Sequence, residues 1–200
     1  TMKKVKNKVP CAALLARGGF EDEKPVAAVK EIVSDVKARG DEALFAYARK
    51  FDDTDLTEET VAVSPAEIEE AYGAVDKELL SSLRLAVKNI LAYHSRNVMR
   101  SDVRSDGAGR TTGYVVRAVE SAGIYVPGGT APLFSSVCMG ILPAKAAGVE
   151  HIYVATPAKG GKVSPATVVA AGECGAEKVF KVGGARAVAA PPVGPGSDPQ

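Results

Sequence analysis

The chain has 200 residues, of which 46% are hydrophobic and 24% are charged. A chain of this length buries roughly 70% of its unfolded surface, which excludes a disulfide-stapled miniprotein and a disordered tail. Its 25 basic and 24 acidic residues leave a net charge of +1 without a long basic block. We therefore expect no nucleic-acid partner.

The cysteines and the N-terminal residues indicate the cellular compartment in which we expect the protein. Cys11, Cys138 and Cys174 are odd in number, lie far apart and lack the CxxC spacing of a zinc knuckle or redox pair. A reducing cytoplasm fits this pattern best. The charged N-terminal residues are followed by no apolar stretch of signal-peptide or membrane-spanning length. We therefore expect no membrane association.

The first hundred residues are predicted to be mostly helical. Apolar residues recur at helical spacing from residue 25, and Gly40 is expected to end that helix. Asp41 is expected to cap the next helix, which runs to the polar loop after Phe51. The longest periodic segment, residues 76–97, predicts a third long helix.

Between these helices, residues 64–67 read Ser-Pro-Ala-Glu, the pattern of a capping box with proline in the first turn. A short strand over residues 60–63 is expected before this cap, and a helix to about Tyr72 after it.

The sequence pattern changes after a predicted loop at residues 102–110. Residues 112–120 suit an extended segment. Three apolar strands then follow a small residue and a glycine, and alanine-rich helical segments separate them; these strands lie within residues 122–126, 147–154 and 174–182, and the helices within 135–147 and 164–173. This alternation predicts an α/β fold in which a helical N-terminal region precedes a partial Rossmann-like parallel sheet.

In such sheets ligands bind beyond the carboxyl ends of the strands. The turns expected there are residues 125–132, 156–162 and 182–186, and Ser135 and Ser136 are expected to cap the helix after the first turn. None of the three contains GxGxxG or GxxxxGK[ST]. Two interpretations stay open: the glycines only join strands to helices, or they bind a phosphate or dinucleotide.

Other candidate residues favour structural roles. His94 is expected near a helix end, and His151 at the start of a strand, opposite the functional end. Cys138 and Cys174 are expected to be buried. The acidic clusters are expected to be solvated loop and helix surface; they comprise Asp52, Asp53 and Asp55, and Glu67, Glu69 and Glu70. No Ser/His/Asp or Cys/His arrangement is visible, and two distant histidines disfavour a catalytic zinc site.

Several segments resemble one known family. They are SAGIYVPGGTAPLFSSV at 121–137, PAKAAG at 143–148, KVGGA at 181–185, AVAA at 187–190, VKARGDEAL at 36–44, and VKNI at 87–90 with the nearby His94. Together they resemble the histidinol dehydrogenases, in order, over roughly residues 24–190.

The resemblance implies an NAD- and zinc-dependent, homodimeric enzyme that oxidises L-histidinol to L-histidine in histidine biosynthesis. Tyr125 matches a tyrosine that contacts the dinucleotide. Arg186 stands where the family typically has a cofactor-binding glutamine, and a cation there could pair with the pyrophosphate or obstruct the site. Ser197, after VGPG at 193–196, stands where the family's GPGN motif has its cofactor-binding asparagine. The cofactor-binding residues expected by resemblance are therefore Tyr125, Arg186 and Ser197.

Family members are roughly twice as long, and their zinc ligands and proton-transferring Glu-His pair lie beyond the part that this chain resembles. We therefore expect a truncated family member that contains no catalytic or metal-binding residue and does not turn over histidinol. Two alternatives stay open, a noncatalytic interaction module and a relative that oxidises another alcohol. The expected division of the chain is an N-terminal segment (1–23), a mainly helical part (24–118), a partial Rossmann-like domain (119–190) and a Pro/Gly-rich tail (191–200).

Overall fold

A computed structural model describes residues 23–128 and 133–189. The predicted helices are present, and all three predicted parallel strands form. The described elements are α2 (Glu23–Arg39), α3 (Asp41–Asp52), α4 (Pro65–Ala74), α5 (Lys77–Arg96), β1 (Asp102–Ser105), β2 (Thr111–Tyr114), β3 (Ser121–Tyr125), α6 (Phe134–Ala146), β4 (His151–Ala155), α7 (Pro165–Cys174), β5 (Lys178–Phe180) and α8 (Gly184–Ala189).

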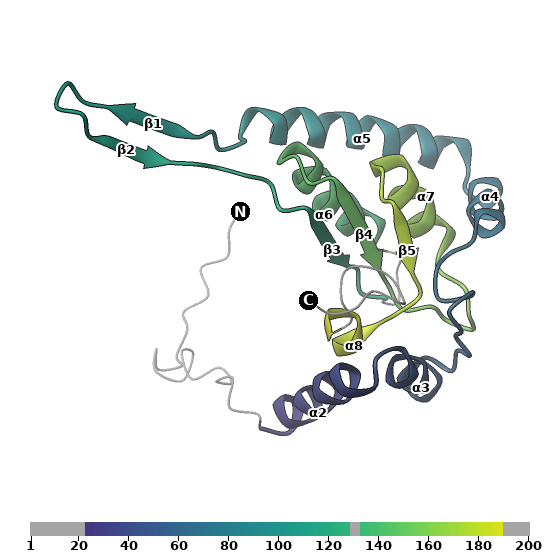
Figure 1. Cartoon of the computed structure of the whole chain (residues 1–200). Coiled ribbons are helices and arrows are strands. Elements are labelled where there is room, and N and C mark those ends of the chain that lie inside the picture. The colour runs from purple at the N-terminus through teal and green to yellow at the C-terminus, as the bar shows by residue number, and fades with distance from the viewer. Residues whose placement is uncertain (1–22, 129–132, 190–200) are drawn as a thin grey trace, which may run out of the picture.

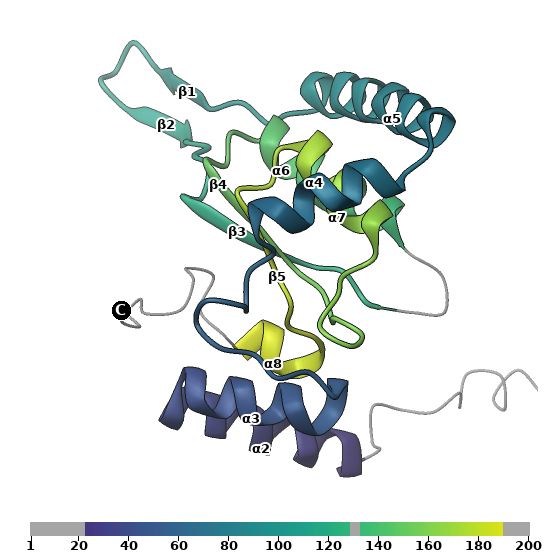
Figure 2. The ribbon, with the colours of Figure 1, turned by 90° about the vertical axis from the view of Figure 1, so that its right-hand side faces the viewer.

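The central sheet has the order β3-β4-β5, and both pairs are parallel. Helices α6 and α7 connect successive strands, as parallel pairing requires, and they pack on the sheet as a second layer. Helices α4 and α5 cover α6 and α7 as a third layer (Figures 1 and 2). This arrangement confirms the predicted α/β class with a parallel three-stranded sheet.

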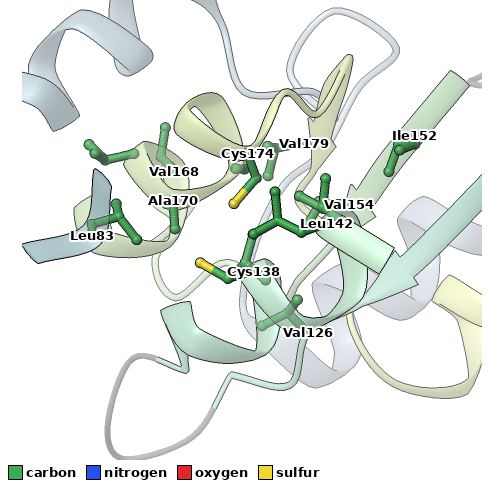
Figure 3. Packing of buried hydrophobic residues seen from close by; sticks show 14 of the residues in the cluster. Leu83, Val126, Cys138, Leu142, Ile152, Val154, Val168, Ala170, Cys174 and Val179 are labelled. Carbon is green, nitrogen blue, oxygen red and sulfur yellow. The ribbon is translucent and has the colours of Figure 1, made fainter. Parts of the chain in front are cut away.

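The main core lies between the sheet and its helices. Helix α7 is buried from Thr167 to Ala171 because it lies between α4 and α6, and a helix that is apolar all round suits that position. Figure 3 shows Cys138, Leu142 and Val154 within this cluster. Leu83 of α5 and Ala71 of α4 belong to the same cluster, so the N-terminal helices share a core with the sheet.

A second, smaller core joins α3 to the end of β5. It contains Leu44, Ala48, Leu56 and Val61 together with Val182. Helix α2 packs against both α3 and α8. Helices α2 and α3 are therefore fixed next to the residues that follow β5.

The helix caps divide into confirmed and wrong predictions. Ser64 and Glu67 form the predicted capping box. The predicted cap at Asp41 is wrong, because Gly40 occupies the cap position and Asp41 lies in the first turn. The predicted caps at Ser135 and Ser136 are also wrong, since α6 begins after Leu133 and has no side-chain cap.

Two strand predictions need correction. Residues 60–63 form no strand; Ala62 makes one isolated antiparallel bridge to Phe180, flanked by the backbone hydrogen bonds from Val63 N to Val179 O and from Lys181 N to Val61 O. Residues 102–110 are not a loop throughout, since β1 pairs antiparallel with β2. Strand β2 ends at Tyr114 instead of continuing to residue 120. A polar four-residue strand carries too little apolar alternation to be recognised from its sequence.

No helix in the described part of the chain has the length and apolar character needed to cross a membrane.

Candidate functional site

The carboxyl edge of the sheet brings the three predicted turns together. Tyr125 ends β3, Ala155 ends β4 and lies opposite Tyr125, and Phe180 ends β5 opposite Ala155. Backbone pairing continues past the strand ends, where Val126 N donates to Ala155 O at 2.9 Å and Thr156 N donates to Phe180 O at 3.0 Å. The residues after these strands therefore start from one rigid edge.

Pro157 fills the space between the first and third turns. A Cβ at Gly128 would lie 2.6 Å from Pro157 Cγ, and a Cβ at Gly183 would lie 2.6 Å from Pro157 Cβ. Real side chains do not approach so closely, so both positions need glycine for packing alone. Close packing of the three turns is therefore enough to account for Gly128 and Gly183. The rest of the first turn, residues 129–132, lies outside the described residues.

Tyr125 links the first turn to the third. Its hydroxyl accepts a hydrogen bond of 3.1 Å from Gly184 N, and Gly184 has the left-handed φ of +63° that favours glycine. Tyr125 remains 39% exposed. The hydroxyl is thus held in place while part of the ring is accessible to a ligand.

Arg186 does not lie in a turn as expected but in the short helix α8, where it is 5% exposed. Its guanidinium forms an ion pair with Asp52 and lies 5.7 Å from the Phe51 ring centre. Its Nε has no hydrogen-bond partner among the described residues. The prediction that Asp52 is solvated surface is wrong: α3 packs near α8, and the Asp52 side chain is only 15% exposed.

Lys181, which follows β5 directly, is a second buried cation at this edge. It is 6% exposed, and its Nζ donates to Glu67 Oε1 at 2.6 Å. Burial alone would raise the pKa of Glu67. The hydrogen bonds from Lys181 and Ser64 lower it by more than burial raises it, so the pKa of Glu67 lies below its ordinary value. Glu67 is therefore a partner of the sheet edge and not plain helix surface, which corrects that prediction.

The sequence predicted neither the role of Lys181 nor the ion pairs of Glu67 with Lys181 and of Asp52 with Arg186. The predicted strand ran through Val182 and so included Lys181; a lysine near the end of an apolar strand was a usable signal. Nothing in the acidic runs distinguished Asp52 or Glu67 from their exposed neighbours, because the partner of each lies more than a hundred residues further along the chain.

The opposite edge of the sheet holds His151, as predicted. Its Nδ1 lies 2.7 Å from Glu177 Oε2, and Tyr153 donates to Glu177 Oε1 at 3.2 Å. The carboxylate of Glu177 raises the pKa of His151 above its ordinary value. Both side chains are about two-fifths exposed, at 42% and 43%, so this is a surface ion pair away from the candidate site.

The remaining candidates are structural or lie outside the described residues. His94 lies near the end of α5, where its ring contacts Tyr93 edge-on at 5.2 Å. Cys138 and Cys174 are buried free thiols in the core shown in Figure 3. The neighbouring Cys138 and burial raise the pKa of Cys174. Cys11 and Ser197 lie outside the described residues.

The described residues do not form a binding site for a zinc ion. Among the described residues no three His, Cys, Asp or Glu side chains gather closely enough to bind one. A cavity of about 110 Å³ lies between α4 and α7, lined by Glu67, Glu70 and Lys162 among mostly apolar residues. Its volume is well below the roughly 300 Å³ of a small ligand pocket, and it does not include Tyr125.

The parallel sheet, its helical crossovers and the turns at its carboxyl edge define an α/β protein with a Rossmann-like sheet. In a comparison with protein families, residues 15–197 match the family described as histidinol dehydrogenase. The chain therefore belongs to the histidinol dehydrogenase family, a family of oxidoreductases, as the resemblance predicted.

Individual relatives agree with this assignment. The chain is 43% identical over 179 residues to histidinol dehydrogenase of Agrobacterium fabrum, covering 90% of this chain and 41% of the relative. It is 40% identical to that of Heliobacterium mobile, covering 91% and 43%. The crystal structure of histidinol dehydrogenase from Elizabethkingia anophelis superposes with a TM-score of 0.77 at 34% identity, covering 86% of this chain and 39% of that one. The chain thus spans about two-fifths of the length of these relatives.

Proposed function

We propose that this chain carries the part of an NAD-dependent, cytoplasmic histidinol dehydrogenase that binds one side of the dinucleotide. The full reaction would be the oxidation of L-histidinol to L-histidine in histidine biosynthesis. Family membership supports the reaction class. The observation that carries the binding proposal is Tyr125, whose ring is partly exposed at the carboxyl edge while its hydroxyl is held by Gly184.

The three proposed cofactor contacts differ in availability. Tyr125 can offer its ring without rearrangement. Arg186 is buried against Asp52, so a contact with the pyrophosphate would require its guanidinium to leave that carboxylate. Ser197 is proposed from the family motif alone. Bound NAD would supply the hydride acceptor for the oxidation, and these residues would bind and orient it.

The described residues do not fit zinc, so no step of the reaction is assigned to the metal in this chain. Zinc dependence, the histidinol substrate and a homodimeric assembly remain proposals that rest on the family. The proposed division at residues 118 and 119 likewise rests on the sequence pattern. Because acid-base groups and a metal each contribute orders of magnitude to such oxidations, we expect no turnover from this chain alone.

Calorimetric titration with NAD tests the binding proposal. We expect a dissociation constant in roughly the 0.1 to 1 mM range, because a single tyrosine edge supplies few contacts. Tyr125→Ala should weaken binding about tenfold, whereas Tyr93→Ala, which removes an exposed tyrosine of α5, should leave it unchanged. Absence of NAD binding, or micromolar binding that Tyr125→Ala leaves unaltered, would contradict the proposal.

A second assay follows NADH formation at saturating histidinol, NAD and zinc, with protein prepared from a strain that lacks its own histidinol dehydrogenase. The expected result is no turnover above background. Turnover near one per second, a common enzyme rate, would show that this chain contains catalytic groups that we have not recognised.

A further inference from the structure

Arg186 lies next to the turn that holds Tyr125. Gly184 N donates to the Tyr125 hydroxyl at 3.1 Å, and a Cβ added at Gly184 would lie 4.0 Å from Arg186 Nη1. The guanidinium is therefore close to the carboxyl edge of the sheet, where ligands of parallel sheets bind. Because its planar fork matches phosphate oxygens, an arginine at this place is suited to a pyrophosphate group.

In the structure, however, the guanidinium is paired with Asp52, the last residue of α3. Helix α8, which carries Arg186, lies beside α3 (Figure 2), and Ala187 packs against the small core that contains Ala48 of α3. Arg186 is 5% exposed, and the Asp52 side chain is 15% exposed. The ring centre of Phe51 lies 5.7 Å from the guanidinium carbon. The fold of α3 thus holds a carboxylate against the guanidinium.

The pair with Asp52 leaves one donor of Arg186 unused. Nη2 donates to Asp52 Oδ2, whereas Nε is buried and has no hydrogen-bond partner in the part of the chain that the structure describes. Buried polar groups are almost always hydrogen-bonded, so the unused Nε indicates that this pairing is incomplete. A phosphate group accepts hydrogen bonds from two guanidinium nitrogens at once. It could therefore satisfy Nε together with a terminal nitrogen.

Asp52 and a phosphate group exclude each other at Arg186. Two anions that approach the same guanidinium repel each other. If the guanidinium turns to a ligand, Asp52 is left as a buried carboxylate without its counterion, which is strongly unfavourable. Binding of an anion must therefore overcome the ion pair that already exists. The affinity of the site for a phosphate group is then set by a residue that does not touch the ligand.

We propose that Asp52 is an autoinhibitory counterion, which holds Arg186 in an ion pair and so keeps the guanidinium from the pyrophosphate of a bound dinucleotide. When the charge of Asp52 is removed, the ligand anion becomes the counterion of Arg186 and binding tightens. Asp52 acts through Arg186 and is therefore a positioning residue. The inference rests on the proposed function for the identity of the ligand, whereas the competition itself can be measured with a simple anion.

A comparison of two ligands tests the wild-type chain. Adenosine and ADP differ only in the diphosphate, so calorimetric titration with each isolates the contribution of that group. Because Arg186 is occupied by Asp52, we expect ADP to bind no more than about threefold more tightly than adenosine. A preference for ADP of more than about tenfold would show that Arg186 is already available to the ligand, and would overturn the proposal. The result does not depend on the folding of any variant.

Removal of the charge of Asp52 tests the release of Arg186. Asp52→Asn keeps the shape of the side chain and should tighten ADP binding about tenfold, without changing the affinity for adenosine. A second substitution, Arg186→Gln in the Asp52→Asn chain, should abolish this gain. Asp55→Asn, which removes an exposed partner of Arg49, is the matched control and should leave both affinities unchanged. In variants that circular dichroism shows to be folded, no gain for ADP, or an equal gain for adenosine, would overturn the proposal.

Inorganic pyrophosphate separates this inference from the proposed function. Asp52→Asn should bind it about tenfold more tightly than the wild-type chain does, whether or not either chain binds NAD. If that gain is seen but neither NAD nor ADP binds, the dinucleotide function fails and the competition at Arg186 stands. If NAD binds through Tyr125 but Asp52→Asn gains affinity for neither pyrophosphate nor ADP, the proposed function stands and the autoinhibitory role of Asp52 is overturned.

Discussion

The two ends of the central sheet belong to the same three strands but differ in how deeply their ion pairs are buried. At the carboxyl end, Lys181 and Arg186 are buried and are paired with acids on the N-terminal helices. At the amino end, His151 and Glu177 pair in contact with solvent. The ion pairs at the carboxyl end hold the N-terminal helices to the sheet edge, whereas the pair at the amino end lies on the solvent-exposed surface.

The difference has a simple energetic basis. Removal of one member of a buried pair leaves an uncompensated charge and costs about 3 to 5 kcal/mol, whereas an exposed pair contributes about 0 to 1 kcal/mol. The comparison therefore predicts a ranked series of effects, from substitutions at the carboxyl edge to those at the amino edge.

The largest effect is expected from Asp52→Ala. This change leaves the Arg186 guanidinium buried without its counterion, and we expect a loss of about 3 kcal/mol in the free energy of unfolding. Urea denaturation measures it. Asp55→Ala, which removes an exposed partner of Arg49, is the matched control and should cost less than about 0.5 kcal/mol. Equal losses in the two variants would remove the distinction between the two kinds of ion pair.

A smaller loss is expected from Gly183→Ala. The new Cβ would lie 2.6 Å from Pro157 Cβ and 3.2 Å from its Cα, so the turn must shift, at a cost of about 1 to 3 kcal/mol. Thermal unfolding should show a lowered midpoint. Gly107→Ala in the turn between β1 and β2, where no atom lies within 4 Å of the new Cβ, is the control; if it lowers the midpoint as much, close packing at the edge is not the cause.

Glu67 predicts a pH dependence at the carboxyl edge. Because its folded pKa lies below its unfolded value of about 4.3, the Glu67 contribution to stability is present above pH 4.3 and is lost as pH falls through the lower folded value. Glu67→Gln should flatten the decline of stability in that acidic range. Glu69→Gln controls for a charge change on the same helix. An unchanged slope in Glu67→Gln would mean that the Lys181 contact does not stabilise the carboxylate.

The smallest effect is expected from Glu177→Gln at the amino edge. NMR titration of His151 should give a pKa above the usual value of about 6.5 in the wild type and a return toward it in the variant. While Glu177 is ionised, the contribution of His151 to stability is fully present below its unfolded pKa and is lost as pH rises through its raised folded pKa; it is also lost in acid as Glu177, whose pKa is lowered, becomes protonated. We expect no measurable change in the urea midpoint. A large loss of stability in Glu177→Gln would show that the His151–Glu177 pair contributes as much as the buried ion pairs, which would contradict the comparison.

The fold could be predicted from the sequence where patterns are local and repeated. Helix α5 follows from its spacing of leucines, and the parallel sheet follows from strands that recur between helical segments. The capping box of Ser64 and Glu67 could be predicted from four adjacent residues. Each of these signals is complete within one short stretch of chain.

The site could be predicted only in part, because its contacts join distant residues. The sequence placed Tyr125 at the correct edge, but not its bond to Gly184, 59 residues away. It left Arg186 in a turn and Asp52 in solvent, since their pairing spans 134 residues. Strand β1 was missed because its pairing with β2 depends on the Asp106 turn and not on an apolar pattern.

We propose that the carboxyl edge, and not the amino edge, is the functional edge of this sheet. The most direct test is to follow backbone amide signals by NMR while NAD is added. We expect the amide signals of Tyr125, Thr156 and Gly184 to shift and those of Ser121 and Glu177 to stay unchanged. Shifts confined to Ser121, His151 and Glu177 would contradict it.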